Sequence, residues 1–327
     1  MIEIKISENE ANQRVDKFLR KYLSDASLSY VYKLVRKKNI KLNGKRAKVD
    51  TILKEGDVLT LYISEENIRI LKGKKTIKNI KKDFKIAYED ENIIIVEKPK
   101  GLLVHGTKDE KKNTLVNQVV AYLNQKGDYN PETEKTFIPA AVNRLDRNTS
   151  GLVIFGKNNR SLQVLNAMIR EKNNIRKFYI AMVEGGLKKP IYVKGNIIKN
   201  QKKNKVSLVS QTNKNTKEIE TIFRPLRGNG IYTIVEAEII TGRTHQIRAH
   251  LSDLGFPILG DEKYGNRKLN DKMRRTFDLK SQYLHAYKIF FQKCYQPLDY
   301  LEGKEIFSDI PMQFKKIEER LLTNRRE

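Results

Sequence analysis

Residues 143–151 read Asn-Arg-Leu-Asp-Arg-Asn-Thr-Ser-Gly and place one carboxylate, Asp146, between Arg144 and Arg147. Positive neighbours favour the ionised form of a carboxylate, so Asp146 suits nucleophilic or electrostatic work better than proton donation. An isolated Arg-x-Asp-Arg is more often a structural ion pair at the surface. The apolar run at 152–155 predicts a buried strand, which would hold this polar segment at a strand end.

Three other polar segments adjoin strand-like runs. They read Lys-Pro-Lys-Gly-Leu-Leu-Val-His at 98–105, Arg-Lys-Phe-Tyr-Ile-Ala at 176–181 and Gly-Arg-Thr-His-Gln-Ile-Arg-Ala-His-Leu at 242–251. Gly-Phe-Pro-Ile-Leu-Gly-Asp follows closely at 255–261. Polar clusters at several strand ends indicate one site that is assembled from distant parts of the chain.

Several chemistries lack the residues that they require. Glycosidic hydrolysis usually needs a second placed carboxylate, and we assign none in these motifs. The chain has neither a Gly-rich phosphate loop nor a Gly-x-Ser-x-Gly elbow. The single cysteine and the four histidines form no ligand cluster in the sequence. We therefore expect neither a metal nor a cofactor.

The charge balance indicates the kind of partner. Lys and Arg outnumber Asp and Glu by 65 to 39, which gives a net charge of +26. A polyanion is the natural partner of such a chain. No apolar run approaches the roughly 20 residues that span a bilayer, and the amino terminus carries acids where a signal peptide would be basic and then apolar. We expect a cytoplasmic monomer without membrane contact.

The first 63 residues show the pattern of a small αβ module. Apolar spacing predicts helices near 15–23 and 30–37, Asn43-Gly44 predicts a tight hairpin, and 58–63 alternates as a strand. Basic residues on the second helix and the hairpin could follow a phosphate backbone. These candidates are Lys33, Arg36, Lys37, Lys41, Lys45 and Arg46.

The rest of the chain divides into a linker and a larger domain. Lysines crowd residues 64–83, which we predict to be a basic linker. Residues 84–327 read as strands joined by turns, with one clear helix near 161–171. Two basic interruptions, at 199–217 and 267–280, are expected to be loops or hairpins that could grip a polyanion. Strands are expected at 84–88, 92–97, 152–157, 177–183, 231–240 and 288–292.

Two parts of the chain resemble known protein families. Residues 14–63, with Leu28-Ser29, Leu42-Asn43-Gly44 and Lys54-Glu55-Gly56-Asp57, resemble the S4 RNA-binding domain. Residues 84 to about 311, with the four polar segments in order, resemble the RluA-type pseudouridine synthases. The second resemblance implies an α+β catalytic domain with a mixed, mainly antiparallel central sheet beside the small αβ S4-like domain. It also implies an isomerase that converts uridine in RNA to pseudouridine without a cofactor.

The resemblance implies a role for each matching residue. Asp146 would attack the ribose or initiate glycosidic cleavage, and the sequence leaves open an acylal or a glycal route. Tyr179 would stack on the target base and could take the proton that carbon loses. Arg248 would pair with Asp146. Arg144 would occupy the gap left by the extruded uridine, and Arg147 is a further candidate for RNA binding.

One residue departs from the family pattern. Asn143 stands where the family often has His, so a hydrogen-bond donor and acceptor remain but titration is lost. We interpret His245, Gln246 and His250 as structural hydrogen-bonding residues.

Several substrates and functions remain open. The S4-like domain favours 23S ribosomal RNA or a large-subunit assembly intermediate as the substrate. Transfer RNA, a non-catalytic RNA-binding or ribosome-assembly protein, and a glycosidic hydrolase are the alternatives.

Overall fold

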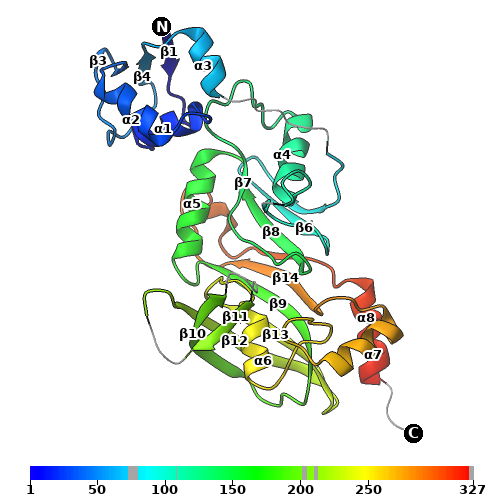
Figure 1. The fold of residues 1–327 in the computed structure, drawn as a ribbon. Helices are drawn as coiled ribbons and strands as arrows, with labels where there is room; N and C mark the ends of the chain where they lie inside the picture. Colours follow the sequence, from blue (N-terminus) through cyan, green and yellow to red (C-terminus); the bar gives the residue numbers. More distant parts are fainter. Residues whose placement is uncertain (73–79, 108, 201–204, 210–212, 324–327) are drawn as a thin grey trace.

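The computed structural model describes residues 1–72, 80–107, 109–200, 205–209 and 213–323. The described chain forms two units, which we call the amino-terminal unit (1–72) and the carboxyl-terminal unit (80–323). Figure 1 shows the first as a lobe at one end of the second. Each unit has hydrophobic clusters of its own.

The amino-terminal unit packs three helices against a four-stranded sheet of order β1-β4-β2-β3. The buried face of the first helix includes Val15, Phe18 and Leu19, as the helical spacing predicts. Asn43 and Gly44 have φ values of 49° and 75°, which are those of the predicted hairpin turn. The strands are β1 (Ile2–Lys5), β2 (Ile40–Leu42), β3 (Lys45–Arg46) and β4 (Val58–Leu61). The helices are α1 (Val15–Tyr22), α2 (Leu28–Arg36) and α3 (Glu65–Lys72).

Helix α3 lies within the segment that the sequence predicts to be a linker. Ile68 is only 2% exposed and belongs to the hydrophobic cluster of the amino-terminal unit, against which Leu71 packs. Two apolar side chains on one helical face are enough to anchor this short helix, so the amino-terminal unit extends beyond residue 63. Residues 73–79 of the predicted linker lie outside the described residues.

The carboxyl-terminal unit is built on an 11-stranded sheet of order β11-β10-β12-β13-β9-β14-β8-β6-β5, with β15 beside β14 and β7 beside β8. The pair β14 and β8 is parallel, and the other described strand pairs are antiparallel. This confirms the predicted α+β fold with a mixed, mainly antiparallel sheet. Figure 1 shows β14 crossing the middle of the unit between β8 and β9.

The elements of this unit have the following bounds. The strands are β5 (Lys85–Glu89), β6 (Ile93–Lys98), β7 (Ala140–Ala141), β8 (Ser150–Gly156), β9 (Ile175–Glu184), β10 (Ile191–Asn200), β11 (Lys205–Val209), β12 (Lys217–Gly228), β13 (Tyr232–Ile239), β14 (Leu284–Phe291) and β15 (Glu305–Phe307). The helices are α4 (Leu115–Lys126), α5 (Asn159–Arg170), α6 (Gln246–Asp253), α7 (Arg267–Phe277) and α8 (Met312–Glu318), with a 3-10 turn at Asp299–Leu301 and a π turn at Glu319–Thr323.

The first basic interruption contains the expected hairpin, because β10 and β11 pair antiparallel, whereas the second forms a helix. Within 199–217, the described residues belong largely to strands β10, β11 and β12, and residues 201–204 and 210–212 lie outside the described residues. Within 267–280, the chain forms α7, an 11-residue helix rather than the expected loop or hairpin. Asn266 caps this helix, and its buried residues are Asn270 and Met273, with Leu269 and Phe277 partly buried against the core. A polar residue on the inner face weakens the helical pattern in the sequence.

Both faces of the sheet are covered around β6 and β8. Ile94 and Val96 join the cluster that contains α4, whereas Ile93 and Ile95 join the cluster that contains α5. Alternate residues of a strand point to opposite faces, so each strand contributes to two apolar layers. The loop that precedes β8 is therefore attached to a strand that is buried throughout.

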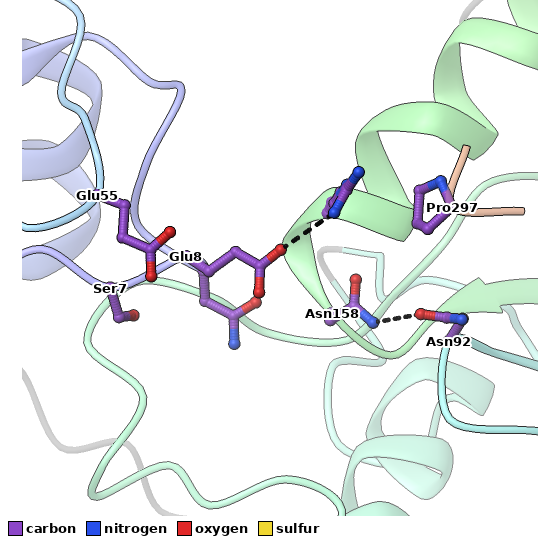
Figure 2. Close-up of a pocket in the computed structure, with 8 residues that line it drawn as sticks. Ser7, Glu8, Glu55, Asn92, Asn158 and Pro297 are labelled. Carbon is purple, nitrogen blue, oxygen red and sulfur yellow. Dashed lines mark hydrogen bonds and ion pairs between the residues drawn. The ribbon is translucent and has the colours of Figure 1, made fainter. Parts of the chain in front are cut away.

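The two units touch through polar side chains. Figure 2 shows Ser7, Glu8 and Glu55 of the amino-terminal unit across a cavity of about 460 Å³ from Asn158 and Pro297. Polar bonds link the units nearby: Asn9 Nδ2 donates to Glu134 Oε1 at 2.8 Å, Asn159 N donates to Asn9 Oδ1 at 3.0 Å, and Gln13 Nε2 donates to Thr136 Oγ1 at 3.2 Å. None of the catalytic candidates lines this cavity.

Gly151 lets β14 approach the start of β8. Its φ is 114°, and an added Cβ would lie 2.1 Å from the carbonyl oxygen of Ala286, its partner on β14. We predict that Gly151→Ala lowers the free energy of unfolding by about 3 kcal/mol or more. Urea unfolding followed by circular dichroism measures this loss.

Gly230→Ala is the matched control for this prediction. Gly230 also has a positive φ, of 86°, but nothing lies within 4 Å of its added Cβ. Its loss of stability should stay near about 1 kcal/mol, the cost of the backbone conformation alone. Equal losses in the two variants would show that the close approach of β14 is not what Gly151 permits.

Candidate active site

Asp146 lies in the loop that leads into β8, and Asn143 fixes the start of that loop. Asn143 Oδ1 accepts the N–H of Ile154 at 2.8 Å, and its Nδ2 donates to the carbonyl of Leu152 at 3.2 Å. Both ends of the amide are thus bound to the backbone of β8. In this position Asn143 uses both the donor and the acceptor of its amide.

The other end of the loop is held by the segment that follows β6. The carbonyl of Arg147 accepts bonds from Lys98 Nζ and from the N–H of Gly101, both at 2.9 Å. Lys98 is 1% exposed and also donates to the carbonyls of Pro99 and Leu102, each at 2.8 Å. Burial lowers the pKa of Lys98 to about 7, but three carbonyl acceptors use all three N–H bonds of the ammonium form. We therefore treat Lys98 as charged.

Arg248, on α6, contacts Asp146 as the resemblance implies. Its Nη1 donates to Asp146 Oδ2 at 2.9 Å, although the two residues are 102 positions apart. The other edge of the same guanidinium binds Asp261, with Nε to Oδ2 at 2.7 Å and Nη2 to Oδ1 at 2.8 Å. Arg248 therefore lies between two carboxylates.

Sequence reasoning assigned no role to Asp261. Its side chain is fully buried, and its Oδ1 also accepts the backbone N–H of Lys263 and of Tyr264. Burial raises the pKa of this carboxyl, but the Arg248 bonds and the backbone donors outweigh it and hold the pKa below its usual value. Bound in this way, Asp261 cannot serve as the second acid or base of a glycosidase. Its only sequence signal was its place in the Gly-Phe-Pro-Ile-Leu-Gly-Asp segment.

Tyr179 lies on β9 beneath small neighbours. Its partners across the sheet are Ala237 on β13 and Ala286 on β14. Burial, and then the charge of Asp146, raise the pKa of the Tyr179 phenol well above its usual value. The phenol is therefore neutral, and it can accept a proton only by giving up its own. The effect of the Asp146 charge on this phenol shows that the two side chains lie in the same part of the structure.

His245 lies closer to Asp146 than a purely structural role requires. Its Nε2 is 3.8 Å from Asp146 Oδ2, and its Nδ1 is 3.1 Å from the hydroxyl of Tyr264. Burial lowers its pKa to about 4, so the ring is neutral at physiological pH. Gln246 and His250 are bound instead to β12, where both contact the Thr221 hydroxyl, as expected of hydrogen-bonding residues.

The arginines beside Asp146 are both exposed at the rim of the site. Arg147 Nη2 donates to Glu110 Oε2 at 2.6 Å. Arg144 lies near His105, whose pKa is lowered by burial and by the Arg144 charge. Arg144 forms no ion pair among the described residues, whereas an RNA strand would have to compete with Glu110 for Arg147.

The amino-terminal candidates for RNA contact lie on α2, directly after it, and on β2 and β3. Lys33, Arg36, Lys37, Lys45 and Arg46 are exposed and Lys41 is half-buried. In the part of the chain that the structure describes, none of these six forms an ion pair with an acid. Unpaired cations keep their full charge for a phosphate backbone.

Neither a metal cluster nor a membrane span is found among the described residues. No group of three or more His, Cys, Asp or Glu side chains there could hold a metal ion. No described helix is long and apolar enough to cross a bilayer.

Comparison with known proteins agrees with the geometry. Residues 92–253 match the family described as RNA pseudouridylate synthase, and residues 13–59 match the S4 domain family. An uncharacterized RNA pseudouridine synthase of Mycoplasma capricolum is 35% identical, over 94% of this chain and 98% of that protein. The ribosomal large subunit pseudouridine synthase C of Vibrio parahaemolyticus is 34% identical, over 88% of each.

A solved structure shows the same fold. The human RNA pseudouridylate synthase domain containing 4 superposes with a TM-score of 0.56 at 22% identity, and the match covers 72% of this chain and 92% of that chain.

Lys98 provides a test of how the Asp146 loop is held. We predict that Lys98→Met lowers turnover by about tenfold or more, because the Arg147 carbonyl loses a buried donor and the loop shifts. Lys100→Met is the control, since Lys100 lies over the Phe314 ring and has no bond to that loop. Initial rates of product formation decide between them, and similar rates for the two variants would contradict the prediction.

The lowered pKa values of three buried histidines predict how the free energy of unfolding depends on pH. Burial is the main influence that lowers the pKa of His245, His250 and His285 to about 4, from 6.5. Below pH 6.5 the unfolded chain binds protons that the folded chain excludes, so this stability is present above pH 6.5 and is lost as the pH falls toward 4. Each histidine contributes up to about 1.4 kcal/mol per pH unit.

Urea unfolding at a series of pH values between neutral and about 5 measures that slope. The free energy of unfolding should fall steeply, and His250→Gln should flatten the fall because one of the three groups is removed. A stability that is independent of pH over this range would refute the prediction.

Proposed function

This chain belongs to the RluA-type family of RNA pseudouridine synthases and carries an S4 domain, and we propose that it converts chosen uridines of 23S ribosomal RNA to pseudouridine with Asp146 as the nucleophile. The family makes the enzyme an isomerase. The single observation that supports the assignment of Asp146 is its bond to a buried Arg248 at 2.9 Å.

The reaction sets requirements that these residues meet. The bond between N1 of uracil and C1′ of ribose breaks, a bond from C5 to C1′ forms, the C5 proton leaves and N1 gains a proton. Nothing is added or lost overall, so the detached base must be kept in place while it turns. Tyr179, with only alanines beside it on β13 and β14, offers a flat wall for that base.

Each further residue has a proposed task. Arg248 orients Asp146 and places a positive charge beside it. Arg144, exposed at the rim, would fill the space that the extruded uridine leaves. Arg147 and the six amino-terminal cations would hold the RNA backbone, with an affinity that falls as salt is raised.

The choice of 23S ribosomal RNA rests on the relatives. A relative that matches 88% of this chain is named as a ribosomal large subunit pseudouridine synthase. The unpaired cations of the S4 domain fit a large folded RNA, where backbone contacts supply affinity and the catalytic loops choose the uridine. Transfer RNA is the alternative substrate, and a protein that binds RNA without turnover is the alternative function.

One experiment tests the proposal. We predict that pseudouridine mapping of ribosomal and transfer RNA will find sites that vanish without this gene and return with the wild-type chain but not with Asp146→Asn. The variant loses the nucleophile but keeps the cationic surfaces, so its affinity for RNA should stay within a few fold. Sites in 23S RNA support the full proposal, and sites in transfer RNA alone correct the substrate.

Two outcomes would contradict the proposal. Full modification by Asp146→Asn would remove Asp146 from the chemistry. An inactive purified wild-type enzyme that gains activity as Asn143→His would show that a titrating group is required at position 143.

A further inference from the structure

Arg248 binds two carboxylates that differ in how deeply they are buried. The side chain of Asp261 is fully buried, that of Arg248 is 6% exposed, and that of Asp146 is 23% exposed. Asp261 receives two parallel N–H bonds, from Nε and Nη2, at 2.7 and 2.8 Å. Asp146 receives one, from Nη1, at 2.9 Å. The edge of the guanidinium that makes two hydrogen bonds thus faces the buried Asp261, and the edge that makes one faces the more exposed Asp146.

This division determines which oxygens of Asp146 are bound. Arg248 Nη1 and the nearby His245 both approach Oδ2. In the described structure no hydrogen bond reaches Asp146 Oδ1 from a side chain. A carboxylate bound through both oxygens by a guanidinium fork would be turned into the plane of that fork, and both lone-pair sets would be engaged. With one oxygen bound, the other keeps its lone pairs for the substrate.

The positive charge of Arg248 is also shared between the two carboxylates. One guanidinium faces two carboxylates, so the group of three carries a net charge of −1 when both acids are ionised. Arg248 therefore orients Asp146 without neutralising it alone. His245 is neutral, and the charges of Lys98 and Asp146 act on each other.

We propose that Asp261 is a positioning residue that occupies the two-bond edge of Arg248, so that Asp146 is held through one oxygen and keeps the other free to react. This inference rests on the proposed role of Asp146 as the nucleophile. Asp261 acts through Arg248 and touches no reacting atom.

The fold holds Asp261 in place independently of Arg248. Its Oδ1 accepts the backbone N–H of Lys263 at 2.9 Å and of Tyr264 at 3.1 Å. Asn270 of α7 clamps the same turn, since its Nδ2 donates to the Asp261 carbonyl at 2.9 Å and its Oδ1 accepts the N–H of Gly260 at 2.7 Å. The Tyr264 ring covers the guanidinium, 5.2 Å from Arg248 Cζ. Asp261 therefore has partners of its own in addition to Arg248.

Asp261→Asn is the decisive variant. It keeps the shape of the side chain but removes the charge, and its NH2 group would face a guanidinium N–H. Arg248 should then turn its free edge toward Asp146 and engage both oxygens. We expect kcat to fall by about a hundredfold, with KM and the affinity for RNA within about threefold of wild type. The rates are measured as pseudouridine formation by each variant on an unmodified RNA that the wild-type enzyme is known to convert.

Asn270→Ala is the control for a merely structural effect. It removes both side-chain bonds that clamp the turn but leaves the partners of Arg248 unchanged. It should lower the melting temperature, while kcat below that temperature stays within about threefold of wild type. If Asp261→Asn does not fold, Asp261→Glu serves instead: it keeps the charge but displaces the carboxylate, and kcat should fall while KM holds.

The outcomes separate this inference from the proposed function. Asp146→Asn is measured in parallel, and an active Asp146→Asn enzyme overturns the nucleophile itself. If Asp146→Asn is inactive while folded Asp261→Asn keeps a kcat within threefold of wild type, only the role of Asp261 is overturned. Parallel losses of kcat and RNA affinity in Asp261→Asn and Asn270→Ala would reduce Asp261 to a structural residue and also overturn it.

Discussion

The active site depends on one buried guanidinium, that of Arg248, placed between Asp146 and Asp261. A buried cation is strongly destabilising unless its N–H groups are bound and its charge is matched, so its partners must be in place when the site forms. The surrounding elements meet that need from four directions. The loop before β8 brings Asp146, α6 carries Arg248, the turn before α7 carries Asp261, and the segment after β6 fixes the Asp146 loop through Lys98.

A second constraint comes from the sheet. Strand β14 enters between β9 and β8 and forms the parallel pair of an otherwise antiparallel arrangement. It thereby joins the half of the sheet that carries Tyr179 to the half that carries Asp146. The join requires Gly151, because a side chain there would meet the backbone of β14. A small residue of this crossing, Ala286, is also the cross-strand partner of Tyr179.

Local sequence determined much of this protein. The alternation of apolar residues in β6 and β8, the Asn43-Gly44 turn and the apolar face of α5 are signals that act over a few residues, and the structure agrees with them. The four polar segments predicted one site, and the structure brings Asp146 and Arg248 into contact. These predictions succeed because backbone geometry and amphipathic spacing are properties of neighbouring residues, and because the motif is long.

Only the tertiary structure decided the rest. Helix α3 was hidden in a lysine-rich segment, since its anchor is the burial of Ile68 in a hydrophobic cluster whose members begin at Ile4. Helix α7 was hidden because its inner face is polar at Asn270. Asp261 looked like any surface acid, and His245 like any core histidine, until α6 and the turn before α7 packed beside Asp146. The effect of a charge depends on what excludes water from it and which partner faces it, and a linear sequence records neither.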